Sequence, residues 1–395
     1  FVKILLFFID KCQLSIYTFQ IKERVMSMLL LFIMQNLIFS IYAAYHLYLS
    51  FFTNYKKSSS ITFIILLCNS FIITRSIEKF THYNMPDLFI FVSDMILALF
   101  IYIVLFYLFT DFIKVIFKLL NTPFINHHLQ GLISVIMAVI ICLLGYLNSH
   151  LTKINEFTIN LNKTVYTPFT FAAVADIHIG SDMTSTRLGK EIQRINRLKP
   201  DFVLIAGDII DNNIHDFTEE YIEEFKKLEA PLGVYVVFGN HEYYSGIQRD
   251  VLSVFNKAGF KTLIDDVVYI PEKEIYIIGR DSLRHTNSSN NERADIETLY
   301  SRIDDKTKPV IILDHITKSS QDGKEINADI QISGHTHDGQ FFPVNLIVKK
   351  MYELSHGMKK YDGFHYFVTS GLGLWGPPVR VGTDSEIMLI HVTNK

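Results

Sequence analysis

The sequence predicts two parts: an all-α transmembrane region, then an α/β domain with a largely parallel or mixed sheet covered by helices. Two observations predict this division. Residues 1–150 contain only 10 Lys+Arg and 6 Asp+Glu, whereas residues 151–395 contain 27 and 34. Long apolar runs fill the first part, and in the second part short apolar runs alternate with helix-like segments, which is typical of an α/β sheet.

Four apolar runs in the first part are long enough to cross a hydrocarbon core of about 30 Å as helices. They occupy residues 26–52, 61–77, 88–109 and 131–147. A buried bundle of soluble helices is the alternative, but such helices show a polar face and these runs are apolar all round. We therefore expect an integral, multi-pass membrane protein whose membrane region covers residues 1–150.

Charges in and around these runs bear on function and orientation. Asp94 is the one acid well inside a predicted span, and it is either a functional intramembrane group or an interfacial one near the start of its helix. No small-residue cleavage site precedes Met26, so we expect no cleavable signal peptide. Lys and Arg flank the spans in nearly equal numbers on both sides, and we expect a cytoplasmic C-terminal domain by a narrow margin.

The composition of residues 151–395 excludes some classes of function. The excess of seven acids argues against a basic surface for nucleic acid, so we expect no nucleic-acid partner. All three cysteines lie in the apolar part, at Cys12, Cys68 and Cys142. A Cys-based zinc site is therefore excluded in the second part, where His, Asp and Asn must supply any metal ligands.

The second part begins with a polar segment, residues 151–167, which we expect to be a linker to a domain over 168–395. Apolar runs without alternation follow, which is typical of strands buried on both faces. They lie at 169–175, 202–206, 234–238, 310–313 and 330–333, and helix-like segments lie at 184–198, 217–228 and 247–258. In such sheets ligands bind at the carboxyl ends of the strands.

Each apolar run ends at a polar motif. The motifs are Asp176-Ile177-His178, Gly207-Asp208-Ile209-Ile210-Asp211, Gly239-Asn240-His241-Glu242, His315 after Asp314, and Gly334-His335-Thr336-His337. Singly they are weak, because a Gly-Asp pair is commonly a turn and a lone His is commonly structural. Together they supply oxygen and imidazole ligands for two metal ions that share one carboxylate, a device for cleaving phosphate esters. The three glycines are expected to accept positive φ where the chain turns.

In this order the motifs resemble those of the calcineurin-like metallophosphoesterases: Asp-x-His, Gly-Asp-x-x-Asp, Gly-Asn-His-[Asp/Glu], His and Gly-His-x-His. The similarity covers roughly residues 168–392 and implies a four-layer αββα sandwich with a two-metal centre at the sheet edge. It assigns one divalent ion (Mn, Fe, Zn or Co) to Asp176, His178, Asp208 and His337. It assigns the other to Asp208, Asn240, His315 and His335, so that Asp208 bridges the two.

The resemblance also implies a mechanism. A hydroxide between the two ions would attack the phosphorus of a phosphoester or pyrophosphate. His241, which is not a ligand in this scheme, would protonate the leaving oxygen or bind the transition-state phosphate, and Asp211 would orient it. A non-catalytic scaffold and a regulatory domain of a membrane transporter or sensor are the alternatives, and the complete motif set favours the enzyme.

Residues 371–380 resemble the C-terminal segment of a bacterial membrane subfamily, some members of which act on lipid-linked pyrophosphates. A lipid-linked phosphate is therefore a candidate substrate, and the membrane an expected partner. Arg380 is either a phosphate contact or part of a surface ion pair. Thr317 stands where many relatives have proline, so we expect a loop difference there. The cleft walls are expected at 282–293 and 341–362.

Overall fold

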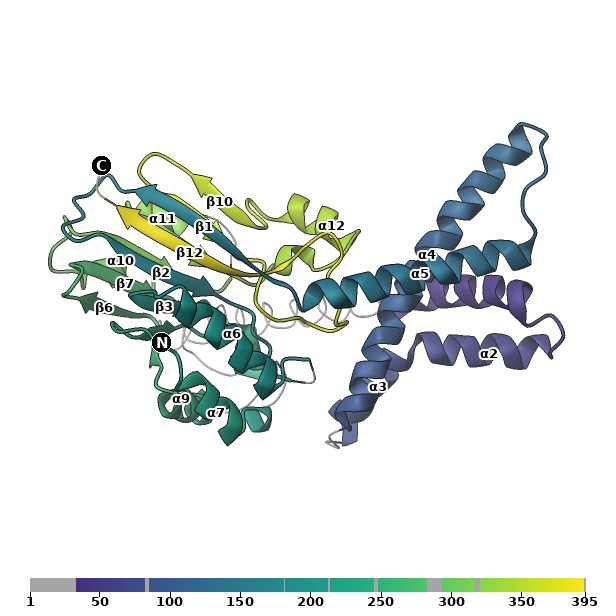
Figure 1. Ribbon diagram of the computed structural model, residues 1–395, viewed down its shortest axis with the longest axis horizontal. Helices are drawn as coiled ribbons and strands as arrows, with labels where there is room; N and C mark the ends of the chain where they lie inside the picture. The colour runs from purple at the N-terminus through teal and green to yellow at the C-terminus, as the bar shows by residue number, and fades with distance from the viewer. Residues whose placement is uncertain are drawn as a thin grey trace, which may run out of the picture. The chain divides into compact units, whose positions relative to one another are not determined.

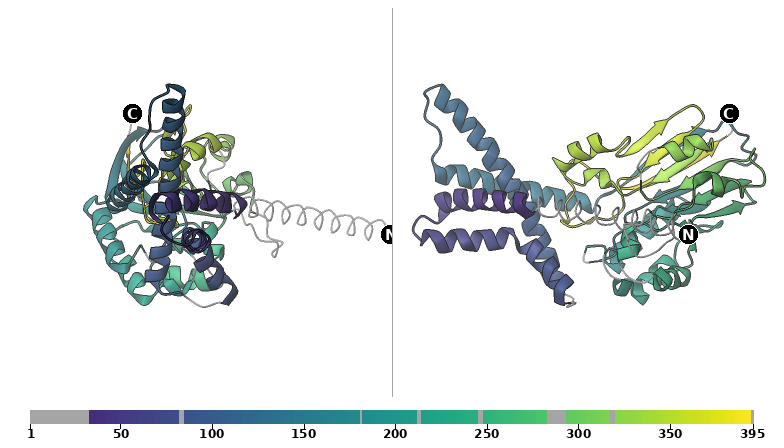
Figure 2. Two further views of the ribbon diagram at one scale, coloured as in Figure 1. Left: turned by 90° about the vertical axis from the view of Figure 1, so that its right-hand side faces the viewer. Right: turned by 180° about the vertical axis from the view of Figure 1, so that it is seen from behind.

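The computed structural model describes residues 33–81, 85–180, 182–211, 214–244, 248–282, 293–316 and 320–393. The chain forms two compact units, of which the first ends at Cys142 and the second begins at Leu143. Figures 1 and 2 show a helical first unit and a second unit built around two sheets. Residues 26–32, the start of the first predicted span, lie outside the described residues.

The helical unit contains a helix over residues 33–51, then α2 (Lys57–Cys68), α3 (Ser70–Thr81), α4 (Asp87–Leu119) and most of α5 (His127–Ser149), whose residues from Leu143 on belong to the second unit. Within the described residues, α4 and α5 are each long and apolar enough to cross a membrane. They contain the predicted spans 88–109 and 131–147, and extend them at both ends. Whether the unit crosses a membrane four times stays a prediction.

The predicted span at 61–77 is not one continuous helix, and its crossing of a membrane stays a prediction. It is divided between α2 and α3, which are long and apolar enough only as a pair and are bent by 56°. Asn69 lies at the break, with backbone angles outside the helical region. Its side-chain amide donates to the Ile65 carbonyl oxygen at 2.8 Å and to the Ser40 hydroxyl at 3.0 Å. A polar side chain that bonds the preceding turn in this way disturbs a regular helix.

Asp94 is buried on α4, and a carboxylate oxygen lies 3.2 Å from a guanidinium nitrogen of Arg75 on α3. A buried charge requires a partner, and this ion pair supplies one. Asp94 thus has a structural role, because its ion pair joins two helices. The sequence interpretations, a functional intramembrane group or an interfacial one, did not include this role.

The second unit contains two mixed sheets of six strands. The first has the order β1 (Thr152–Asn160), β12 (Ser385–Thr393), β2 (Phe169–Val174), β3 (Phe202–Ile205), β4 (Val234–Val236) and β5 (Lys261–Thr262). The second has the order β10 (Gly357–Lys360), β11 (His365–Val368), β9 (Ile330–Ser333), β8 (Val310–Leu313), β7 (Ile275–Gly279) and β6 (Asp266–Ile270). The pairs β2–β3, β3–β4, β7–β8 and β8–β9 are parallel, whereas β12 runs antiparallel to β2.

Three apolar cores separate four layers. The middle core lies between the sheets, where Phe202 and Leu204 of β3 pack with Ile311 and Leu313 of β8. A second core joins the other face of the first sheet to α6 (Ser185–Arg197), α7 (Glu219–Phe225) and α9 (Gln248–Lys257). A third joins the second sheet to α10 (Ile296–Tyr300) and to the residue after α11 (Gln321–Glu325). The expected αββα sandwich is confirmed (Figure 1).

The remaining helices are short. They are η1 (Ile214–Asp216), α8 (Asn240–Tyr244), η2 (His337–Gly339) and α12 (Val344–Met351). Two of them begin at residues predicted as metal ligands, Asn240 and His337.

The linker predicted at 151–167 is wrong for most of its length. Residues 152–160 form β1, which pairs in parallel with β12 from Thr152↔Ser385 to Asn160↔Thr393. Ile159 of β1 is buried in the middle core, and the ring of Phe157 lies 5.2 Å from that of Phe367. Because β1 is an edge strand with one exposed face, its alternating polar residues gave it the composition of a linker.

Candidate metal centre

The seven predicted ligands lie just beyond the carboxyl ends of five strands. They follow β2 (Asp176, His178), β3 (Asp208), β4 (Asn240), β8 (His315) and β9 (His335, His337). The edges of both sheets therefore contribute to one site. Backbone contacts also join the loops, since the amide of His335 donates to the Asp176 carboxylate at 3.0 Å.

The first group of converging atoms contains Asp176, His178 and His337, whose ligand atoms lie within 4.8 Å of one another. The Nε2 atoms of His178 and His337 are 3.1 Å apart, and that of His337 is 3.6 Å from Asp176 Oδ1. Three Lewis-base side chains aimed at one point form the donor set that a divalent transition metal takes.

The second group contains Asp208, His315 and His335, again within 4.8 Å. His315 Nε2 lies 3.1 Å from Asp208 Oδ2 and 3.2 Å from Asn240 Oδ1. The same Asp208 oxygen lies 3.9 Å from His178 Nε2 in the first group. Asp208 thus lies between the two groups, where a bridging carboxylate is required.

The negative charge of the Asp208 carboxylate also favours the binding of a cation. Burial disfavours ionisation of this carboxylate, but His315 and other nearby imidazoles outweigh burial and lower its pKa far below the usual range. Burial likewise disfavours a charged His315, yet Asp208 raises the pKa of His315 to about 10. Burial raises the pKa of Asp176 to about 6. Protons and a metal ion therefore compete for these side chains.

Neighbouring groups fix which imidazole nitrogen faces the centre. His315 Nδ1 lies 2.7 Å from the Ala206 carbonyl oxygen, and His178 Nδ1 lies 3.3 Å from Asp211 Oδ1. Each contact assigns the remaining proton to Nδ1 and leaves Nε2 as the ligand atom. The residues present therefore fit two divalent ions.

The ligand residues have unusual backbone angles. Five have positive φ, namely Asp176, His178, Asp208, His335 and His337, at +54°, +48°, +53°, +72° and +49°. Such angles cost about 1–3 kcal/mol each in a non-glycine residue and occur where function requires them. The left-handed turns direct side chains from strand ends into the centre.

The glycines have a different role from the one expected. Gly207 has positive φ, at +79°, as predicted. Gly239 and Gly334 do not, and they are needed for space instead. A Cβ on Gly239 would lie 2.0 Å from Asp208 Oδ1, and one on Gly334 would lie 2.8 Å from Asp176 Oδ2.

Glu242 is a functional residue to which the sequence analysis gave no role, although it ends the third motif. It is fully buried, and its carboxylate accepts backbone hydrogen bonds from Asp208 at 2.9 Å, Ile209 at 2.7 Å, Ile210 at 3.1 Å and Gly239 at 2.7 Å. It therefore holds the loop after β3 against the loop after β4. The sequence contains a pattern that indicates this role, because an acid in the first turn of a helix commonly accepts hydrogen bonds from backbone amides.

His241 and Asp211 lie together, but not as the sequence analysis expected. His241 Nδ1 contacts the backbone carbonyl of Asp211, whereas the Asp211 carboxylate is 3.6 Å from that nitrogen and 3.3 Å from His178 Nδ1. Asp211 thus positions His241 through its carbonyl and the ligand His178 through its carboxylate. His241 also lies near enough to His178 and Asp208 to form a third possible metal group.

Neither interpretation of Arg380 is correct. Its guanidinium is buried and donates to the carbonyl oxygens of Ser370 at 2.7 Å, Gly373 at 2.9 Å and His337 at 3.3 Å. Burial lowers the pKa of this group to about 10. Arg380 holds the C-terminal loop against the ligand loop after β9. Asp314, beside His315, pairs with Arg293.

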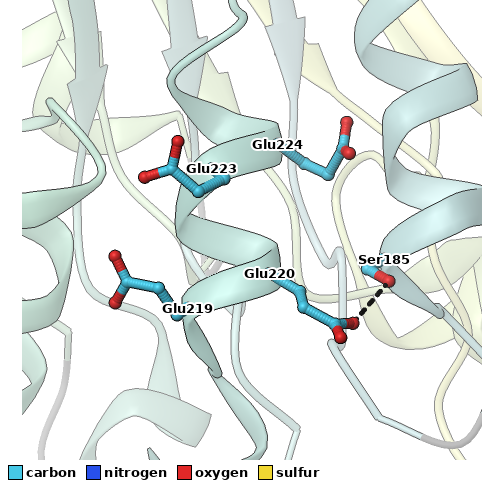
Figure 3. Close-up of a pocket in the computed structure, with 5 residues that line it drawn as sticks. All are labelled: Ser185, Glu219, Glu220, Glu223 and Glu224. Atoms are coloured by element: carbon cyan, nitrogen blue, oxygen red, sulfur yellow. Dashed lines mark hydrogen bonds between the residues drawn. The ribbon is translucent and has the colours of Figure 1, made fainter.

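A surface cavity of about 390 Å³ lies apart from this centre. Its lining is Ser185 and four glutamates of α7, and Figure 3 shows Ser185 donating to Glu220 at 3.2 Å. No predicted ligand lines it, so it is not the catalytic cleft. Of the predicted cleft walls, 283–292 lie outside the described residues, and 341–362 contain α12 and β10.

The fold and the converging ligands define a two-sheet sandwich with a candidate two-metal centre, and comparison with known proteins gives its family. Residues 169–339 match the calcineurin-like phosphoesterase family. The chain carries a calcineurin-like phosphoesterase domain. Members of this family bind two metal ions and are generally phosphoester hydrolases.

Individual relatives cover only part of the chain. An uncharacterized metallophosphoesterase of Helicobacter pylori is 31% identical over 62% of this chain and 64% of its own length. A transmembrane protein with a metallophosphoesterase domain from Danio rerio is 27% identical over 54% of this chain and 51% of its own. The chain thus spans less than two thirds of either relative. A dimetal phosphatase structure from Danio rerio has a TM-score of 0.35 and 15% identity, covering 52% of this chain and 88% of that chain, a likeness too low to bear on function.

We expect Gly334→Ala to weaken metal binding roughly 10- to 100-fold, because the new methyl would displace the Asp176 carboxylate. Gly180→Ala is the matched control, since its Cβ would lie 3.7 Å from the nearest atom. Metal affinity measured by competition with a fluorescent chelator tests this. Equal affinity in the two variants would contradict the spatial role of Gly334.

We expect Glu242→Gln to lower the free energy of unfolding by about 2–4 kcal/mol, because an amide N–H₂ would face backbone donors that now bond a carboxylate. Glu219→Gln, on the exposed face of α7, should change it by less than about 0.5 kcal/mol. Thermal unfolding of both variants in detergent measures the difference. The proposed joining of the two loops is wrong if Glu242→Gln unfolds at the wild-type temperature.

Proposed function

We propose that this protein is a membrane-anchored phosphohydrolase that uses two divalent metal ions to cleave a phosphoester or pyrophosphate bond. One observation carries the proposal: two groups of candidate ligands converge at the edge of the sandwich, and Asp208 lies between them. Two bound ions would supply Lewis acidity for the phosphoryl oxygens and lower the pKa of water at the site. Transition metals such as Mn, Fe, Zn and Co suit these nitrogen and oxygen ligands.

The protein's own residues supply orientation and proton transfer. Because the Asp211 carbonyl engages His241 Nδ1, we assign proton transfer to Nε2, which would protonate the leaving oxygen. The His241 amide donates to Asp208 Oδ1 at 2.9 Å, so the acid and the shared ligand keep a fixed separation. The side chain is partly exposed, as contact with a substrate requires.

A lipid-linked phosphate or pyrophosphate is the substrate class we favour. Two helices with the length and apolar character of membrane spans precede the catalytic unit. Such an anchor concentrates the site where lipid headgroups lie. The acidic composition of the catalytic unit does not favour nucleic acid, and a cytoplasmic site remains our expectation. A non-catalytic scaffold is the second candidate, but scaffolds need neither His241 nor a complete ligand set.

We expect hydrolysis of bis(p-nitrophenyl) phosphate by the full chain in detergent to require added Mn²⁺ and to disappear on prolonged treatment with EDTA. Zn²⁺ and Co²⁺ should restore it in part, since the same donors bind these ions. Turnover that survives complete removal of metal, verified by elemental analysis, would refute the two-metal function. A panel of lipid phosphates then identifies the preferred substrate.

We expect His241→Asn to reduce kcat roughly 10²- to 10⁴-fold while the protein keeps its metal, because the acid is lost and the proposed ligands remain. His215→Asn, outside the proposed ligand set, serves as a control for substitution of a histidine. Metal content and kcat are measured on the same preparations. Loss of metal from His241→Asn would make His241 a ligand instead.

A further inference from the structure

Exposed apolar side chains gather in one segment of the catalytic unit. Among the described residues after 151, nine large apolar side chains are exposed, and six of them lie between 342 and 375. Those six are Phe342, Leu346, Ile347, Met351, Met358 and Trp375. Such a concentration on a soluble face marks a place of contact with a membrane or a partner.

Five of these side chains belong to one region, which we call the α12 surface: Phe342, Leu346, Ile347, Met351 and Trp375. Ile347 and Met351 are one helical turn apart, with exposed fractions of 56% and 70%, and Leu346 is adjacent. On the opposite side of α12, Asn345 is buried. The exposed side of α12, a helix labelled in Figure 1, therefore carries Leu346, Ile347 and Met351 together with Lys350, which lies one turn after Leu346.

Hydrogen bonds bring Trp375 to the start of this helix. The Trp375 amide donates to Gln340 Oε1 at 2.9 Å, and Gln340 Nε2 donates to the Trp375 carbonyl at 3.0 Å. The Phe342 amide donates to the Val381 carbonyl at 2.9 Å, so the two segments are held together at a second place. Trp375 is the only tryptophan of the chain, and 56% of its surface is exposed.

The same C-terminal segment holds the end of a candidate span. Residues 143–149 of α5 belong to the catalytic unit, where the Arg380 amide donates to the Gly145 carbonyl at 2.9 Å and Asn148 Nδ2 donates to the Thr383 carbonyl at 2.9 Å. Leu143, Leu144 and Leu147 are also exposed. Residues 375–383 therefore contact both the α12 surface and the end of a helix apolar enough to cross a membrane.

The charged residues of α12 indicate what the α12 surface binds. Lys349 and Lys350 are exposed in the last turn of α12, and Lys350 lies one turn from Leu346. Apolar side chains with flanking lysines and a tryptophan are typical of helices that lie in the interface of an anionic membrane. A protein partner would bury the apolar side chains, but it would not require lysines beside them or a nearby span.

The α12 surface also adjoins the metal centre. Gln340, which holds Trp375, lies three residues after the ligand His337, and Arg380 bonds the carbonyl of that ligand. We propose that the α12 surface lies in the headgroup region of the bilayer that α5 enters, with Lys349 and Lys350 facing anionic lipid. This contact would present membrane-embedded phosphates to the centre, a consequence that rests on the proposed hydrolase function.

The fluorescence of Trp375 tests the contact directly. The full chain is reconstituted in vesicles of phosphatidylcholine and phosphatidylglycerol, with or without phosphatidylcholine that carries bromine near the headgroup end of the acyl chain. We expect bromine to reduce the Trp375 emission by roughly half, since an interfacial tryptophan lies at that depth. The double variant Leu346→Glu/Ile347→Glu should recover most of the emission. Ile154→Glu is the control, because Ile154 is an exposed apolar residue of β1 outside the α12 surface, and it should not recover the emission.

Emission unaffected by brominated lipid would overturn the proposal and leave a protein partner as the occupant of the surface. Quenching that persists in Leu346→Glu/Ile347→Glu would overturn it too, because the span alone would then hold Trp375 at the membrane.

Lys349→Gln/Lys350→Gln should weaken quenching only when phosphatidylglycerol is present. The measurement is made with EDTA and no substrate, so its failure is distinct from failure of the hydrolase function. Hydrolysis of the chromogenic diester in detergent should be unchanged in all these variants.

Discussion

The site depends on the buried carboxylate of Glu242. Four backbone amides from two loops donate to it, including that of Asp208, which lies between the two ligand groups. Without this acceptor, the loops after β3 and β4 would have buried donors without partners, at a cost comparable to the stability of a domain. The same contacts fix Asn240 and His241, which lie between Gly239 and Glu242. One carboxylate thus positions the proposed bridging ligand, a proposed terminal ligand and the proposed acid.

Hydrogen bonds to main-chain atoms also join the second sheet to this arrangement. The Asp176 carboxylate accepts from the His335 amide, and Arg380 bonds carbonyls of the ligand loop and the C-terminal loop. The predicted ligands therefore come from both sheets, and hydrogen bonds fix the loops that carry them. These hydrogen bonds offset the unfavourable positive φ of five predicted ligands, because the surrounding structure holds the backbone in that conformation.

Much of this architecture follows from local sequence patterns. The runs at 202–206 and 310–313 have no polar face because each strand lies between two apolar cores, and ligands follow them because parallel strands end at one edge. Other features depend on tertiary contacts that no local pattern shows. The alternation of β1 predicts a linker, Arg380 bonds the carbonyl of His337, which is 43 residues away, and Asn69 divides an apolar run. Three of the four backbone amides that Glu242 binds lie more than 30 residues away.

The central claim is that Asp208 holds two metal ions between the sheets. Elemental analysis of the full chain, purified in detergent with Mn²⁺ and freed of excess metal, tests it most directly. We expect about two ions per chain, fewer than one for Asp208→Asn, which removes the shared ligand, and one for Asn240→Ala, which removes a ligand of the second group only. A single ion per wild-type chain, or two ions retained by Asp208→Asn, would contradict it.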